Sequence, residues 1–135
     1  MAGGIHPDTA DDLLDSYFGS GTPATLYYGL FTAMPDADGT GATEATGGGY
    51  ARESATNNAT NFPAASAGVQ KNGAAVTWSA FSADLGEILG VGVFEAESGG
   101  EPTFWALFSS PRTVLNGQGL EIPVNGISFT MRSAA

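Results

Sequence analysis

The sequence predicts an all-β fold: an antiparallel β-sandwich of jelly-roll type, preceded by one short N-terminal helix. Charged residues make up only 13% of the 135 residues, about half the usual share. The polar surface must therefore come largely from Gly, Ser, Thr and Asn, which favour strands and turns over surface helices. Apolar runs also recur at short intervals between Gly, Asn, Asp and Pro turns, as expected of a sandwich or barrel.

Residues 7–19 contain the helix signal. Asp8 or Thr9 is placed to cap the amino end, and acidic residues follow where the helix dipole is positive. Gly19 is a natural stop at the other end. The apolar residues expected to share one face of the helix are Leu13, Leu14, Tyr17 and Phe18.

The remaining chain carries the strand patterns. Pro123 should place its strand at a sheet edge or end it. Residues 103–110 have apolar side chains on both faces, which predicts a central strand of the sandwich or, alternatively, a subunit interface on the second face. The expected strands cover residues 25–32, 73–81, 88–96, 103–110, 113–115, 119–124 and 126–131.

The same patterns divide the chain into an N-terminal arm with the helix, residues 1–24, and a β-sandwich domain, residues 25–135. A long connection, residues 33–72, is rich in Gly, Ala, Thr and Asn. Structureless loops of this length are uncommon in compact domains unless they bind something. We expect one short strand at about residues 50–55, with the rest extended along the surface or across a subunit boundary.

The charge balance argues against two classes of partner. Four basic residues stand against fourteen acidic ones, which gives a net charge of −10. Nucleic-acid backbones and anionic membranes both attract Lys and Arg, so we expect neither as a partner. The N-terminus lacks a basic segment followed by an apolar run, and no stretch is long enough to span a bilayer, so we expect no signal peptide and no membrane anchor. Cysteine is absent, which excludes thiolate chemistry.

The stretch EATGGGYARE, residues 44–53, raises the question of a phosphate-binding loop. Such loops follow a strand, precede a helix and usually carry a Lys, but no amphipathic helix and no Lys follow these glycines, and their spacing fits neither a dinucleotide-binding loop nor a P-loop. The glycines are better explained as a permissive turn before a strand. His6 is the only histidine, and no nucleophile and base stand in a recognisable arrangement. We therefore expect no catalytic residues, no cofactor and no enzymatic activity.

The stretch PDADGTGATE, residues 35–44, is faintly similar to a calcium loop because Asp36, Asp38 and Glu44 lie close together in sequence. It lacks the ligand spacing and the flanking helices of an EF-hand. A Pro-Asp-x-Asp-Gly sequence is also a good solvated turn. The sequence favours the turn and leaves a structural metal open.

Three segments together resemble a family of small structural proteins of tailed-bacteriophage virions, described as decoration, cement or tail-fibre-like proteins. The segments are LYYGLFTAMPDADGTGATEATGGGYARESA, NGAAVTWSAFSADLGEILGVGVFEAESGG and FWALFSSPRTVLNGQGLEIPVNGISFTM. Their order spans Leu26 to Met131. The resemblance implies a jelly-roll-type β-sandwich, no enzymatic activity, and assembly in a virion as a homotrimer or another symmetric oligomer.

From this resemblance we expect a capsid cement or decoration subunit that is made in the host cytoplasm and contacts the major capsid protein. One alternative is a tail, neck or fibre-base adaptor bound to a tail component. Another is a carbohydrate-binding host-recognition module, which would need Trp78 or Trp105 on an accessible face. The candidate interface residues are Tyr17, Phe18, Tyr50 and Arg52, for which packing within the chain is the alternative explanation.

Overall fold

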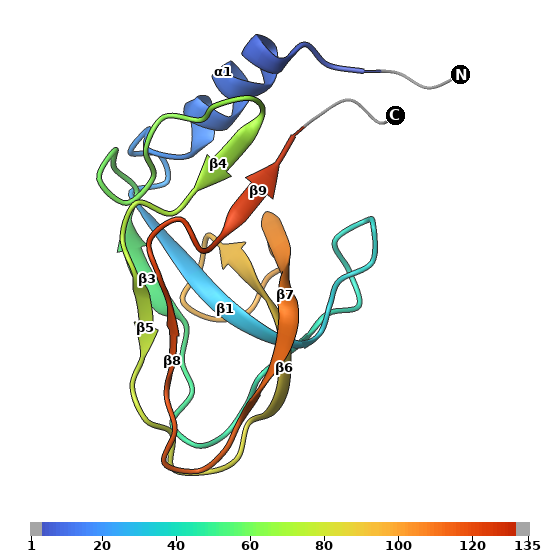
Figure 1. The fold of residues 1–135 in the computed structure, drawn as a ribbon, viewed down its shortest axis with the longest axis vertical. Coiled ribbons are helices and arrows are strands. Elements are labelled where there is room, and N and C mark those ends of the chain that lie inside the picture. The colour runs from blue at the N-terminus through green and yellow to red at the C-terminus, as the bar shows by residue number, and fades with distance from the viewer. Residues whose placement is uncertain (1–3, 132–135) are drawn as a thin grey trace. The chain divides into compact units, whose positions relative to one another are not determined.

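The computed structural model describes residues 4–131 (Figure 1). Within them the chain forms two compact units. The first comprises residues 4–25, 56–75 and 123–131, and the second comprises residues 26–55 and 76–122. The expected division into residues 1–24 and 25–135 stays a prediction, and its ends, residues 1–3 and 132–135, lie outside the described residues.

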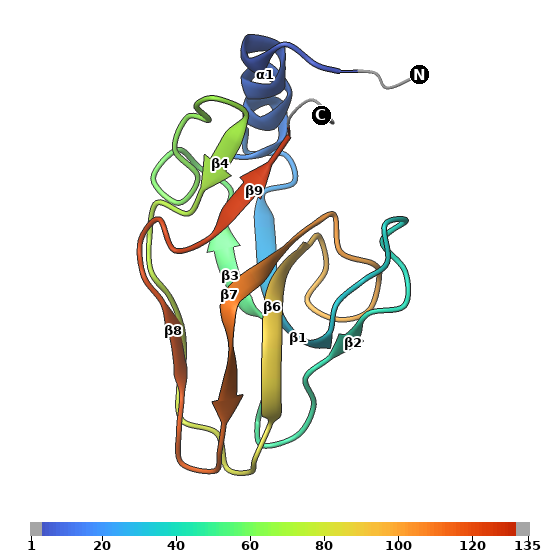
Figure 2. The same cartoon turned by 45° about the vertical axis from the view of Figure 1, so that its right-hand side comes forward.

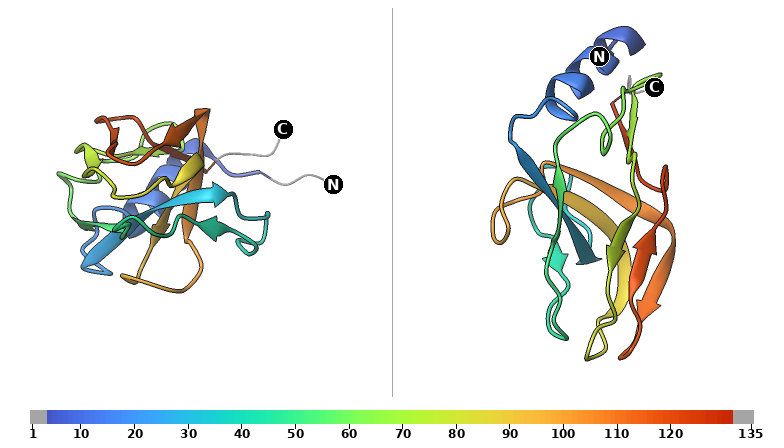
Figure 3. Two further views of the ribbon diagram at one scale, coloured as in Figure 1. Left: turned by 90° about the horizontal axis from the view of Figure 1, so that it is seen from below. Right: turned by 90° about the vertical axis from the view of Figure 1, so that its left-hand side faces the viewer.

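The second unit is built on a five-stranded sheet with the strand order β2-β1-β6-β7, in which β3 also pairs with β1. The register of β1 with β2 and β6, and of β6 with β7, is antiparallel, and Figure 2 shows β6 and β7 side by side. A separate antiparallel pair joins β5 to β8, as the right panel of Figure 3 shows. The strands are β1 (Thr25–Ala33), β2 (Thr43–Glu44), β3 (Glu53–Thr56), β5 (Val76–Trp78), β6 (Gly86–Phe94), β7 (Phe104–Val114) and β8 (Leu120–Ile122).

The first unit combines the helix α1 (Pro7–Tyr17) with the antiparallel pair β4 (Val69–Lys71) and β9 (Ser128–Thr130). The helix packs against β4. The core of this unit includes Phe18, whose ring centroid lies 5.2 Å from that of Phe62 and 5.6 Å from that of Phe129. These aromatic contacts give this small unit an apolar centre of its own.

The helix differs from its predicted form at both the cap and the buried face. His6 is the N-cap, because its Nδ1 accepts a hydrogen bond from the Asp8 amide at 3.2 Å. Pro7 then starts the helix at a position where a missing N–H costs nothing. Leu14 is fully buried, whereas Leu13 is 48% exposed, because adjacent helical residues point about 100° apart. The prediction that Leu13 shares the buried face is therefore wrong.

Most predicted strands are confirmed, with shorter or shifted bounds, and one forecast about their position is wrong. The expected strands at 103–110 and 113–115 form one strand, β7, at the end of the sheet order rather than at its centre. The connection 33–72 contains two strands that the sequence did not predict, β2 and β4. The antiparallel, mostly β character with one short helix is confirmed, while the jelly-roll sandwich stays a prediction.

The two faces of the five-stranded sheet differ in residue size. Opposite residues of paired strands share a face, and on one face the buried side chains Tyr28 and Leu30 stand beside Val93 and Val91. On the other face Gly29 stands opposite Gly92, and Phe31 stands opposite Gly90. We call this second face, which carries Gly29, Gly90 and Gly92, the glycine face.

Candidate functional site

The glycine face has room for large groups to lie flat on the sheet. A Cβ atom on Gly29 would come within 2.8 Å of the Phe94 ring and 2.9 Å of the Glu44 carboxylate. A Cβ atom on Gly92 would come within 2.5 Å of the Phe31 ring. The missing side chains therefore allow an aromatic layer and a charged group to pack directly against the backbone.

Arg52 is the centre of this arrangement. Its Nε donates to Oε2 of Glu44 and its Nη2 to Oε1, both at 2.9 Å, in the two-pronged geometry that suits a carboxylate. Nη1 donates to the carbonyl oxygens of Ala96 at 2.8 Å and Gly99 at 2.9 Å. The guanidinium carbon also lies 3.4 Å from the centroid of the Phe94 ring.

Tyr50 completes the cluster. Its hydroxyl donates to Oε2 of Glu44 at 2.6 Å and accepts from the Leu30 amide at 2.9 Å. Burial, followed by the hydrogen bond to Glu44, raises the pKa of Tyr50 well above its ordinary value. The hydroxyl therefore remains protonated, and so remains a donor to Glu44, far into the alkaline range.

The glycine run before Tyr50 delivers it to this position. Gly47, Gly48 and Gly49 all have positive φ angles, of 83°, 62° and 80°. The Tyr50 amide donates back to the Gly47 carbonyl, closing a turn. The prediction of a permissive turn is confirmed, and only glycine adopts three such conformations in succession without strain.

The resulting cluster of Glu44, Tyr50, Arg52 and Phe94 is a structural lock rather than a reactive site. The Arg52 side chain is 4% exposed and that of Glu44 is 26% exposed, and the donors of Arg52 bind groups of its own chain. The lock fastens two irregular segments, residues 45–52 and 95–99, to the sheet. A buried, mutually satisfied ion pair of this kind fixes one conformation of the loops that carry it.

The four predicted interface residues divide between the two units. Tyr50 and Arg52 meet in the lock, whereas Tyr17 and Phe18 belong to the first unit, with their rings 5.0 Å apart. Phe18 is 2% exposed. All four make the intramolecular contacts that the alternative explanation expected, and a role at a subunit boundary stays a prediction for each.

The β7 edge of the sheet has an exposed surface that is not among the predicted interface residues. Leu107 on β7 stands opposite Gly90, on the glycine face, and is 69% exposed. Residues 109–113 of the same strand are exposed as well. We call Leu107 and residues 109–113 the β7 edge. The sequence did contain a signal for this surface, because the strand has apolar side chains on both faces. A subunit interface on the second face was one of the two explanations for that pattern.

The acidic turn at residues 36–44 is organised by its own hydrogen bonds. Oδ1 of Asp38 accepts from the Thr40 amide at 3.1 Å and from the Thr40 hydroxyl at 2.7 Å. These bonds lower the pKa of Asp38. Glu44 is bound to Arg52 instead, and no group of three potential metal-ligating residues occurs within residues 4–131.

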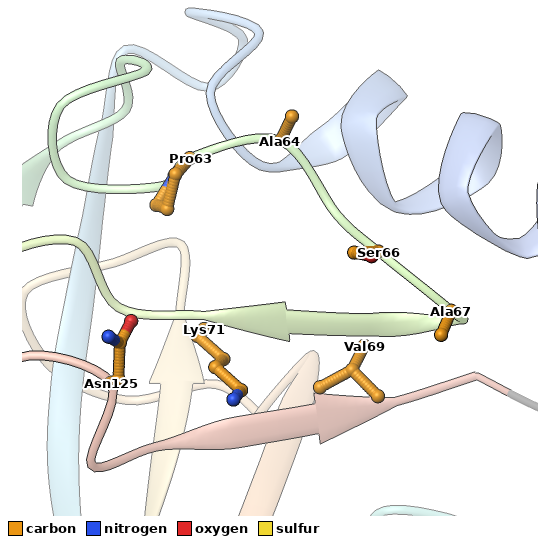
Figure 4. Close-up of a pocket in the computed structure, with 7 residues that line it drawn as sticks. All are labelled: Pro63, Ala64, Ser66, Ala67, Val69, Lys71 and Asn125. Carbon is orange, nitrogen blue, oxygen red and sulfur yellow. The ribbon is translucent and has the colours of Figure 1, made fainter.

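The first unit contains a shallow hollow of about 380 Å³. Figure 4 shows small side chains around it and the Lys71 amine as its one charged group. Ser66 supplies a hydroxyl, but no Asp, Glu or His lines the hollow to act as a general base for it, so the hollow has no evident catalytic chemistry. Its lining residues are Pro63, Ala64, Ser66, Ala67, Val69, Lys71 and Asn125.

The two tryptophans bear on carbohydrate binding. Trp78 is 2% exposed, and its Nε1 donates to the Ala51 carbonyl at 3.0 Å. Trp105 is half-buried, and a Cβ atom on Gly39 would lie 3.5 Å from its ring. Trp78 therefore offers no open ring face for a sugar.

Among the described residues, 4–131, no helix has the length and apolar character of a membrane span.

The comparison with known proteins places this chain among phage proteins. A family model described as "Podophage GP4 fiber I protein gp80" matches residues 5–130. No curated protein sequence matches the chain. Because the family model covers nearly all of the sequence, the chain belongs to the podophage fiber I protein gp80 family and is a structural protein of the phage virion.

Proposed function

We propose that this chain is a non-enzymatic structural subunit of the tail-fibre apparatus. The observation that carries this proposal is the match of residues 5–130 to a family described as a fiber protein. The site geometry supports it, because the charged and aromatic groups of the lock are consumed in fixing loops. A rigid surface with an exposed strand edge suits assembly better than turnover.

The capsid cement role expected from the sequence is the second candidate within the virion. It shares the compact acidic domain and the use of many identical copies. No contact on the glycine face or at the β7 edge favours it over a fibre position, and the family description favours the fibre. A homotrimer or another symmetric oligomer suits either position.

A carbohydrate-binding module is the candidate from a different functional class. Burial of Trp78 removes one of the two aromatic side chains on which it depended, which leaves Trp105 alone. Binding of a host glycan would then require the half-buried Trp105 ring to act without a second aromatic. We therefore place this candidate behind both structural ones.

Copy number per purified virion separates the fibre from the cement role. Quantitative mass spectrometry would compare this protein with the major capsid protein. A fibre subunit should occur in a small multiple of the tail symmetry, far below the capsid protein. A ratio close to that of the capsid protein would overturn the fibre assignment and favour the cement role.

Immunogold labelling of intact virions provides an independent reading. A fibre subunit should be labelled at the tail, and labelling spread over the capsid would contradict the proposal.

A glycan array probed with the purified chain tests the third candidate, the carbohydrate-binding module. Saturable binding that is lost in Trp105→Ala but kept in Trp78→Phe would revive the carbohydrate-binding role.

A further inference from the structure

Within residues 4–131, β7 is the long edge of the five-stranded sheet, with β6 as its one strand neighbour. In the strand order β2-β1-β6-β7 it ends the sheet, while the opposite edge consists of the short strands β2, of two residues, and β3, of four, which both pair with β1. Figure 2 allows β7 to be followed along β6. A free edge can pair with another chain, and proteins usually block such edges by shortening, bending or charging them. Shortness protects the edge made by β2 and β3, so β7 is the edge to consider.

Part of β7 is blocked, but part is left open. Leu107 stands opposite Gly90 and Arg112 opposite Ile88, so residues 108–111 face only Leu89. This bulge includes Pro111, which has no backbone N–H to donate. Strand pairing along the whole edge is thereby prevented. The segment from Phe104 to Leu107 keeps a regular ladder with β6 and ends in the exposed leucine.

Leu107 has the greatest exposure among the large apolar side chains exposed within residues 4–131, at 69%. Burial of an exposed leucine side chain is favourable in proportion to the apolar area that is removed from water. Covering Leu107 would therefore favour association without disturbing any contact of the lock.

The charge distribution indicates what covers this edge. The chain carries fourteen acidic residues and a net charge of −10, yet none of the acids lies between Phe104 and Val114. Two copies repel each other over most of their surfaces and can approach where acids are absent. A symmetric contact reuses the same patch on both subunits, so a patch that is apolar at Leu107 and carries no acid meets its own copy without repulsion between carboxylates.

We propose that the open segment Phe104–Leu107 of β7, whose most exposed side chain is Leu107, is a contact site for a second copy of this chain. This inference deepens the proposed role as an assembled fibre subunit and rests on it. The lock supports the contact indirectly, because it holds the glycine face beside the edge in one conformation. The bulge at residues 108–111 limits the contact to a short segment, which favours a closed oligomer over open-ended stacking.

Sedimentation velocity on the purified full chain tests the proposal. We expect the mass to rise above the monomer value of 13.6 kDa as the concentration increases through the micromolar range. Leu107→Ser should weaken this association about tenfold or more, which corresponds to about 1.4 kcal/mol. Leu107→Asp should weaken it further, because each copy gains a carboxylate at the contact.

Leu13→Ser is the matched control, since Leu13 is an exposed leucine, at 48%, on the helix of the other unit. It should associate as the unaltered chain does. Added salt should strengthen the association by screening the mutual repulsion of the acidic copies. A contact made by ion pairs would weaken instead, and that result would contradict the apolar contact proposed here.

Two results would overturn the inference. One is a mass that stays at the monomer value at the highest concentration, and the other is association that both Leu107 variants leave unchanged. Circular dichroism would verify that the variants remain folded. This experiment uses the isolated chain, so a negative result would not affect the fibre role, which is tested by the copy number in virions. A copy number that contradicts the fibre role would likewise not affect the association measured here.

Discussion

The two units stabilise their buried polar groups by different chemistry. In the first unit the buried polar side chains are neutral amides, Asn57, Gln70 and Asn72. In the second unit a carboxylate, a guanidinium and a phenol bind one another in the lock. Both devices hold irregular segments in place, but only the second depends on charge. The comparison shows that a chain with few charged residues still places one of its four basic side chains at a structural centre.

The amides of the first unit act as cross-links between loop backbones. Asn57 donates to the carbonyls of Tyr17 at 2.9 Å and Pro23 at 3.0 Å, and its Oδ1 accepts from the Gly19 amide at 2.6 Å. Asn72 similarly donates to two carbonyls and accepts from the Ile127 amide. Because amides do not titrate, these cross-links should be indifferent to pH.

The largest predicted effect is that of breaking the lock. Arg52→Met removes the guanidinium and leaves the Glu44 carboxylate without its cationic partner, with the Tyr50 hydroxyl as its remaining donor. Breaking a buried pair typically costs 3–5 kcal/mol, and the partial exposure of Glu44, at 26%, points to about 3 kcal/mol. Urea denaturation would measure the loss in the free energy of unfolding.

Arg112→Met is the control for that substitution. Arg112 is exposed, lies 5.6 Å from the Phe108 ring centroid, and donates one hydrogen bond to the Glu121 carbonyl. Surface substitutions of this kind stay within about 0.5 kcal/mol. Equal losses for the two variants would show that the lock contributes no more than a surface arginine.

The next effect is expected from Asn57→Ala in the first unit. The substitution leaves the Gly19 amide and two carbonyls unpaired, and each buried unsatisfied group costs about 1–3 kcal/mol. Since small rearrangements admit water, we expect a total of about 2–3 kcal/mol. The exposed neighbour Asn58, whose side-chain Oδ1 accepts from the Asn61 amide, serves as the control, and a loss as large in Asn58→Ala would refute the cross-link explanation.

The contrast also explains which parts of the fold were predictable. β1 and β6 were expected, because nine-residue runs rich in aliphatic and aromatic side chains predict strands from local sequence alone. β2 and β4 were missed, because strands of two and three residues owe their existence to distant partners. The central position expected for β7 failed for a related reason: apolar residues on both faces do not reveal whether the second face is covered.

The candidate site was predictable to a similar depth. The sequence drew attention to Tyr50 and Arg52 because an aromatic and a rare basic residue follow three glycines. Glu44 was noted only as a possible calcium ligand. Phe94 was not foreseeable as a partner, because the register that places it beside Gly29 joins segments some 65 residues apart. Spacing alone indicates which residues are unusual, and pairing decides what they contact.

A smaller effect should distinguish the units by pH. Burial and the Glu44 hydrogen bond raise the pKa of Tyr50 in the folded chain above its ordinary value of 10.0. The stabilisation by the protonated phenol is therefore complete below about pH 10 and is lost as pH rises above that value. Tyr50→Phe should cost about 1 kcal/mol at neutral pH, for the hydrogen bonds, and should show a shallower alkaline decline.

The measurement is the urea midpoint of both proteins from neutral pH to about pH 11. Some decline remains in Tyr50→Phe, because burial also raises the pKa of Tyr28. Asn57→Ala should keep the full alkaline slope of the unaltered chain, since an amide does not titrate. Identical slopes in the unaltered chain and Tyr50→Phe would contradict a coupling between this phenol and folding.

The smallest effect is expected at Gln70, the one buried amide that is only partly satisfied. Its Nε2 donates to the carbonyls of Pro63 at 2.7 Å and Lys71 at 3.0 Å, but its Oε1 has no partner among the described residues. Gln70→Met sacrifices two hydrogen bonds, removes an unsatisfied oxygen and retains the volume. These changes oppose each other, so the net change in unfolding free energy should stay within about 1 kcal/mol.

Gln70→Glu provides a sharper test, because it keeps the shape of the side chain and replaces the amide donor with a carboxylate that can only accept hydrogen bonds when ionised. A carboxylate in this position would face two carbonyl oxygens without donating to them, and burial would oppose its charge. It should therefore destabilise the chain more than Gln70→Met, and increasingly so as pH rises through the carboxyl pKa. If Gln70→Met costs as much as Asn57→Ala, then a half-satisfied amide is worth as much as a fully satisfied one, and hydrogen-bond partners do not determine how the first unit is held.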